Sequence, residues 1–142
     1  MFSKALFVST LLAALALSAS AAPVETRQDS SVYSTQTNTL SASSARTTWF
    51  SDKQGSCDIP FSQSELIVAL NAEMMGDLQG PDSQCGRRMQ VSYKGKTINC
   101  KVVDTCPSQY CVNGAIDLSE AAFKQLAGDL DIGVIQTTWK LL

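Results

Sequence analysis

Apolar and polar residues alternate along several short stretches in the second half of the chain, which is the pattern of half-buried β-strands. Residues 87–104, RRMQVSYKGKTINCKVVD, alternate with period two on both sides of Lys94-Gly95 and predict a β-hairpin. Residues 133–142, GVIQTTWKLL, predict a final strand. One face of that strand carries Ile135, Thr137, Trp139 and Leu141.

Two further stretches predict strands earlier in the chain. Residues 47–51, TTWFS, are rich in β-branched and aromatic side chains. Residues 66–70, LIVAL, form a short continuous apolar run, as expected of a strand buried on both faces. Periodicity alone does not distinguish such a run from a buried helical turn.

Short helices are predicted between the strands. One helical turn begins at Asn71, a capping residue, and stops at Gly76. A longer helix begins after Ser119, whose hydroxyl can cap it, and ends at Gly128. Strands dominate, so the pattern predicts a mainly β fold, a small β-barrel with helical inserts.

The first 21 residues have the features of a secretory signal. Lys4 supplies the positive end, an apolar run extends from Ala5 to Leu17, and Ala19-Ser20-Ala21 fits a cleavage site. A membrane anchor is the alternative, but the run is shorter than the roughly 18–20 apolar residues that a spanning helix needs. We therefore expect a secreted protein, located outside the cell or in a cell wall, with no membrane contact once the signal is removed.

Residues 22–46 differ in composition from the rest of the chain. Ten of these 25 residues are Ser or Thr, and few are large and apolar. Such a segment cannot bury enough surface to offset its chain entropy, so it is predicted to be disordered, either a linker or a propeptide. The folded unit is then expected over residues 47–142.

Charge and cysteine content limit the functions of this unit. Eight Lys and Arg stand against eleven Asp and Glu, which does not favour nucleic acid as a partner. All five cysteines lie here, and disulfides are the default in an oxidising compartment, with one thiol left over. The cysteine spacings match no zinc pattern and the chain has no histidine, so no metal is expected. No phosphate-binding or dinucleotide motif predicts another cofactor.

Two aspartates are the candidate acid/base groups. The lack of histidine excludes Ser-His-Asp and Cys-His sites, which leaves carboxylate chemistry, a reactive thiol or binding alone. Asp104 ends an apolar run and Asp117 stands just before the predicted helix. The helix end favours an ionised Asp117, whereas burial or a neighbouring Asp104 would raise its pKa. Alternatively, Asp117 only fixes the loop against the helix.

The segments TTWF, VVDTC, AIDLSEAAF and IGVIQTTW resemble, in this order, the double-psi β-barrel of the expansin and rare-lipoprotein-A group. This group also includes barwin-like proteins and small secreted fungal relatives. An acid followed after a loop by DLS and a short helix is a specific signature of the group. The resemblance covers essentially all of residues 47–142 and implies a mainly β, six-stranded double-psi β-barrel with short helices.

The resemblance also implies roles for single residues. Asp117 matches the acid on which wall loosening and the related glycan-cleaving enzymes rely, and Asp104 matches the acid lining the same groove. Thr48 matches the threonine that faces them from the first strand. The general base of related endoglucanases aligns with Ser51. Asp52 is one residue later, and neighbours on a strand point to opposite faces, so the chain is expected to lack this base, as expansins do.

The group's pattern further implies disulfides between Cys57 and Cys85 and between Cys106 and Cys111, with Cys100 unpaired. A Cys100–Cys106 bond is the rival pairing.

Aromatic side chains could stack on sugar in the implied groove, and we select Trp49 and Tyr110, together with Thr48, as candidates for substrate binding. A tryptophan on a strand is more often part of the core. The resemblance thus implies a protein that binds or loosens cell-wall polysaccharide of the cellulose, chitin or peptidoglycan type, without efficient hydrolysis. The alternatives are a secreted barwin-like protease inhibitor or effector module, and a weak glycan-cleaving enzyme of endoglucanase or lytic type.

Overall fold

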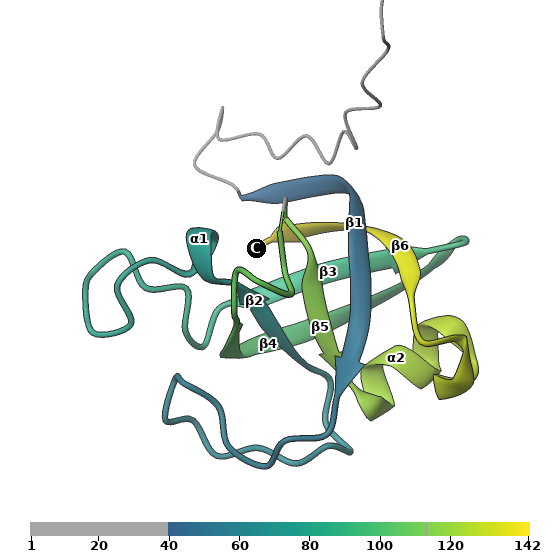
Figure 1. The fold of residues 1–142 in the computed structure, drawn as a ribbon, viewed down its shortest axis with the longest axis horizontal. Coiled ribbons are helices and arrows are strands. Elements are labelled where there is room, and N and C mark those ends of the chain that lie inside the picture. Colours follow the sequence, from purple (N-terminus) through teal and green to yellow (C-terminus); the bar gives the residue numbers. More distant parts are fainter. Residues whose placement is uncertain (1–39, 113) are drawn as a thin grey trace, which may run out of the picture.

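The computed structural model describes residues 40–112 and 114–142 (Figure 1). The predicted signal, residues 1–21, and the tract up to residue 39 lie outside this range. The strands are β1 (Ser41–Phe50), β2 (Ile67–Asn71), β3 (Arg88–Tyr93), β4 (Lys96–Cys106), β5 (Ile116–Ser119) and β6 (Ile135–Leu141). The helices are α1 (Ala72–Met75), α2 (Glu120–Ala127) and a 3-10 turn, η1 (Leu130–Ile132).

The six strands form a closed barrel in the order β1-β5-β2-β4-β3-β6, with β6 pairing back onto β1. β1 runs parallel to β5 and β2 runs parallel to β4, while the other neighbours are antiparallel. The predicted fold class, a mainly β, six-stranded barrel with short helices, is confirmed.

The β3–β4 hairpin forms where the alternating pattern predicts it. Tyr93 pairs with Lys96, and the two residues between them have positive φ, 45° at Lys94 and 80° at Gly95. Two successive residues of positive φ are the mark of a type I′ turn, which matches the twist of the flanking strands.

The barrel interior is filled by alternate residues of β6 and by one face of α2. Along β6, every residue predicted for the inner face is buried. Trp139 lies in the core and its indole N–H donates to the Gly114 carbonyl at 2.8 Å. From α2, Phe123 and Leu126 pack into the same core. The buried hydroxyls of Thr47 and Thr137 are hydrogen-bonded to each other at 2.7 Å.

β1 begins six residues earlier than predicted, which corrects the expected disorder of residues 41–46. Its first half pairs with β6, from Ser41 opposite Lys140 to Thr47 opposite Ile135, with a bulge between Ala42 and Ala45. Both alanines are buried. Small residues gave little hydrophobic signal here, and pairing with a distant strand decides the conformation instead.

The helix boundaries agree with the sequence prediction. Asn71 caps α1 by accepting from the Glu73 N–H, and Ser119 caps α2 by accepting from the Ala122 N–H. Gly128 follows α2 with φ 95°. No helix in the described part of the chain is long and apolar enough to cross a membrane.

Candidate functional site

Four neighbouring strands place the candidate acids in one row. Thr48 of β1 pairs with Asp117 of β5, and Asp117 pairs with Ala69 of β2, which in turn pairs with Asp104 of β4. The two aspartates are therefore two strand spacings apart, about 10 Å between Cα atoms. Ala69 lies between them and belongs to a small cluster separate from the barrel core, so this row lies on the outside of the barrel.

A cleft of about 390 Å³ lies over this row, a size typical of small-ligand sites. It is lined by Phe50, Asp52, Ala69, Asp104, Thr105, Cys106, Pro107, Tyr110 and Asp117. Because alanine has the shortest side chain after glycine, the floor between the two acids is open. The structure thus brings Asp104 and Asp117 to one shared cleft.

Asp117 is the half-buried acid of the cleft. The Thr48 hydroxyl donates to its Oδ1 at 2.6 Å. Burial raises the pKa of Asp117 above the usual carboxyl value, and the nearby charges of Asp52 and Asp104 act in the same direction. The Thr48 hydrogen bond and the positive charge of Arg46 lower the pKa but do not outweigh burial. The carboxyl of Asp117 is therefore protonated more readily than an exposed carboxyl, and it lies where it can contact a ligand in the cleft.

Asp104 has a different local environment. Its Oδ1 accepts from the Ser56 N–H at 2.8 Å and from the Thr105 N–H at 2.7 Å. The Ser56 hydroxyl also donates to Thr105 Oγ1 at 2.7 Å. Asp104 therefore fastens the loop between β1 and β2, residues 51–66, to β4 while it lines the cleft.

Asp52 lines the cleft, although strand alternation predicted that its side chain would point away from the site. That expectation assumed strand alternation through residue 52, but β1 ends at Phe50, so alternation does not determine where Asp52 points. Its carbonyl accepts from the Gln63 side-chain amide at 2.6 Å, which fixes the backbone there. Ser51 is not among the lining residues. Within the described residues, no three His, Cys, Asp or Glu side chains are grouped to hold a metal ion.

Of the two aromatic candidates for substrate binding, Tyr110 lines the cleft and Trp49 does not. Tyr110 lines the cleft and is 65% exposed, in the loop between Cys106 and Cys111. Trp49 does not line it: this side chain is half-buried, packs against the core and donates from its indole N–H to the Leu130 carbonyl at 3.0 Å. The core role that the sequence left open for a strand tryptophan is the one observed for Trp49.

Both disulfides implied by the resemblance are present, Cys57–Cys85 and Cys106–Cys111. Cys100 is free and buried in the barrel core, and burial raises its pKa to about 12. The rival Cys100–Cys106 pairing is wrong.

The chain is similar in sequence and structure to a bacterial protease inhibitor. It is 40% identical over 100 residues to a papain inhibitor from Streptomyces mobaraensis, a match that covers 67% of this chain and 68% of the relative. The solved structure of the Streptomyces papain inhibitor matches with a TM-score of 0.60 at 37% identity. That match covers 72% of this chain and 94% of the inhibitor.

A plant protein and an expansin are also similar to this chain. Kiwellin from Actinidia chinensis is 33% identical over 98 residues, covering 60% of this chain and 44% of kiwellin. A mutant expansin from Clavibacter michiganensis, solved in complex with cellohexaose, matches with a TM-score of 0.59 at 25% identity. This match covers 70% of the chain and 50% of the expansin. The chain thus corresponds to half or less of these two relatives. No family model matches the chain.

Proposed function

Because the chain belongs to the barwin-like family of double-psi β-barrels, with the Streptomyces papain inhibitor and expansin among its relatives, we propose that its acidic cleft binds cell-wall polysaccharide. One observation supports this proposal above all: the strand register sets Asp104 and Asp117 on either side of Ala69 in an open cleft with Tyr110 at its edge. The expansin relative was solved with a cello-oligosaccharide, which agrees with a sugar ligand.

Asp117 is the residue that we assign to direct contact with the polysaccharide. Thr48 occupies Oδ1, so Oδ2 is the oxygen available to a ligand. Oδ2 of the Asp117 carboxylate accepts a hydrogen bond from a sugar hydroxyl, whereas an asparagine, with its Oδ1 held by Thr48, would present only N–H donors there. Tyr110, exposed at the edge, supplies an aromatic face for a sugar ring.

The charges of the cleft select the kind of polysaccharide. Asp52, Asp104 and Asp117 all line it. A surface of one sign repels ligands of the same sign, so we propose uncharged chains of the cellulose or chitin type and not uronate-rich polymers.

The environment of the second carboxylate, Asp104, agrees with binding or loosening of polysaccharide without efficient hydrolysis. Inverting cleavage needs a base that activates water across the sugar ring, with the two carboxyl groups roughly 6.5–9.5 Å apart. One oxygen of Asp104 is already committed to two backbone N–H groups. The position aligned with the base is Ser51, which does not line the cleft. Asp52 is then the residue on which any residual cleavage would depend.

Isothermal titration of the purified chain with cellohexaose, chitohexaose and oligogalacturonate tests the proposal, with a reducing-sugar assay alongside. We expect a neutral hexaose to bind and the galacturonate not to bind. Asp117→Asn should weaken binding by about two- to tenfold, the worth of one hydrogen bond. Asp129→Asn is the matched control, since this acid caps η1 outside the cleft and asparagine also caps.

The results of these assays distinguish polysaccharide binding in the cleft from hydrolysis. The cleft is not the polysaccharide site if the wild-type protein binds none of the neutral chains, or if Asp117→Asn and Asp129→Asn bind equally well. Efficient release of sugar that disappears in Asp117→Asn or Asp52→Asn would establish the hydrolase alternative instead.

Inhibition of a secreted cysteine protease is the second candidate, favoured by a different feature. The loop closed by Cys106–Cys111 presents Tyr110, and Val112 directly after it is 53% exposed. A short disulfide-closed loop with exposed apolar side chains is a preorganised surface for a protein partner. Papain activity in the presence of the chain is the test: Tyr110→Ala should relieve the inhibition and Asp117→Asn should not. Full inhibition by Tyr110→Ala would exclude this loop as the contact.

A further inference from the structure

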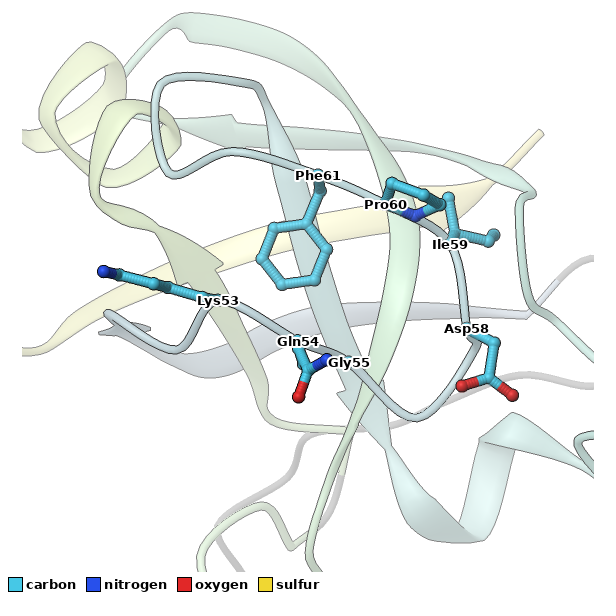
Figure 2. A pocket seen from close by; sticks show the side chains of 7 residues that line it. All are labelled: Lys53, Gln54, Gly55, Asp58, Ile59, Pro60 and Phe61. Atoms are coloured by element: carbon cyan, nitrogen blue, oxygen red, sulfur yellow. The ribbon is translucent and has the colours of Figure 1, made fainter.

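A second hollow lies inside the loop between β1 and β2. It has a volume of about 410 Å³ and is lined by Lys53, Gln54, Gly55, Asp58, Ile59, Pro60 and Phe61. Figure 2 shows the loop folding back on itself, with the Phe61 ring facing the arm that carries Lys53 and Gln54. Residues 58–60 form the opposite arm. The hollow is therefore bounded by a single loop and lies outside the acidic cleft described above.

The loop is held to β4 by close backbone packing. Gly55 approaches the Val103 carbonyl so closely that a Cβ at this position would lie 2.3 Å from the oxygen. The next residue, Ser56, donates its N–H to Asp104 at 2.8 Å. The start of the hollow is thus fixed directly beside one of the cleft acids.

Two further restraints fix the rest of the loop. The Cys57–Cys85 disulfide ties its middle to the segment before β3. The Gln63 amide bonds to the carbonyl of Asp52, which joins the two ends of the loop. A hollow whose walls are fixed before binding costs little ordering entropy when a ligand enters.

An aromatic pair connects this hollow with the cleft. Phe50 lines the cleft and Phe61 lines the hollow. Their rings pack edge to face with centroids 6.2 Å apart. Both rings are half-buried, so each keeps part of its surface accessible from its own side. The two hollows are therefore adjacent, because one ring of this contacting pair lines each of them.

The chemistry of the lining fits one sugar unit. A pyranose has an apolar face of C–H groups, which packs on an aromatic ring, and a rim of hydroxyls that both donate and accept hydrogen bonds. Phe61 supplies the ring. Gln54, Asp58 and Lys53 line the same hollow and carry an amide, a carboxylate and an ammonium group. An apolar surface bordered by a few polar groups is the usual composition of a small-ligand pocket.

We propose that the hollow at residues 53–61 is a second sugar subsite, which extends the acidic cleft so that one polysaccharide chain occupies both. Phe61 stacks on a pyranose ring there, while Asp117 holds another unit of the same chain. This inference rests on the proposed binding of polysaccharide, and it adds that the protein recognises a run of several sugar units.

Titration with cello-oligosaccharides of two to six units tests the subsite in the full chain. Affinity of the wild-type protein should rise with length until both hollows are filled. Phe61→Leu keeps an apolar side chain but loses the ring face, so it should weaken cellohexaose binding about three- to tenfold and leave cellobiose unchanged. Phe61→Tyr keeps the ring and should retain the length dependence.

A second variant, Gln54→Ala, tests the subsite at a position where substitution should not disturb folding of the loop. Gln54 is exposed, so Gln54→Ala should leave thermal unfolding unchanged while weakening the hexaose selectively. Gln79→Ala, an exposed glutamine in another loop, is the matched control and should bind as wild type. If cellohexaose binds the wild-type protein but neither Phe61→Leu nor Gln54→Ala alters its affinity, the subsite is overturned while the cleft proposal stands. If no oligosaccharide binds the wild-type protein, the cleft proposal fails and the subsite with it.

Discussion

Gly55→Ala is expected to detach the β1–β2 loop from β4. The added Cβ would lie 2.3 Å from the Val103 carbonyl oxygen and 2.9 Å from the Asp104 Cβ. Both neighbours belong to a central barrel strand and cannot move aside, so the loop must move. φ at Gly55 is not in the left-handed region, so alanine has no conformational penalty of its own there.

The magnitude follows from the contacts that this movement breaks. The bond from the Ser56 N–H to the Asp104 carboxylate is worth about 1.5–3 kcal/mol and the Ser56–Thr105 hydroxyl bond about 0.5–1.5 kcal/mol. Replacing glycine by alanine restricts the unfolded chain and returns about 0.4–1 kcal/mol. The expected net loss is about 1–4 kcal/mol. For a domain of this size, each kcal/mol lowers Tm by about 4–8 °C.

Urea and thermal unfolding without reductant measure this loss, with Gly80→Ala as the control. Gly80 also has φ outside the left-handed region, and its added Cβ would lie no closer than 3.0 Å to any neighbour, the nearest being Asp77. We expect Gly80→Ala within about 1 kcal/mol of wild type. Equal stability of wild type and Gly55→Ala would refute the close packing of this loop, and with it the fixed subsite.

Three other predictions test the interior and the cleft. Asp117→Asn should stabilise the protein at pH 7, because the raised folded-state pKa of Asp117 makes wild-type stability fall as pH rises from the usual carboxyl range through the raised value. In Tm measurements between pH 3 and 8, the excess of the Asp117→Asn Tm over the wild-type Tm should shrink toward acid pH. An excess that grows toward acid pH would contradict the upward direction of the pKa shift. Cys100 should resist iodoacetamide at pH 8 in the native protein and take up one equivalent after unfolding without reductant, whereas rapid native labelling would contradict its burial. Thr137→Val should cost about 1 kcal/mol in urea unfolding by removing the buried bond to Thr47, against a smaller effect of Thr138→Val on the exposed side of the same strand; equal effects would mean that the buried bond adds nothing.

The elements with strong local signals could be read from the sequence. Strict alternation and a glycine turn determine the β3–β4 hairpin, and alternation alone determines the inner face of β6. Capping side chains at Asn71 and Ser119 mark the starts of both α-helices. These features depend on neighbours within a few residues, so the chain encodes them locally.

Features set by distant contacts could not be read in the same way. The first half of β1 consists of small and polar residues, and its extended form depends on pairing with β6, more than 90 residues later in the sequence. Asp52 reaches the cleft because the strand stops at Phe50, and the packing of the following loop determines that stop. Trp49 was a candidate for sugar binding until its bond to Leu130, in another element, placed it against the core.

The row that joins Asp104 and Asp117 through Ala69 makes the separation of the two acids a property of the hydrogen-bonded ladder. Even the tie from Asp104 to the loop uses the backbone N–H of residue 56, which every amino acid except proline supplies. Foreign sequences grafted at residues 58–61 and 107–110, with Gly55 and Cys57 kept, would therefore alter what the protein recognises without moving the two acids.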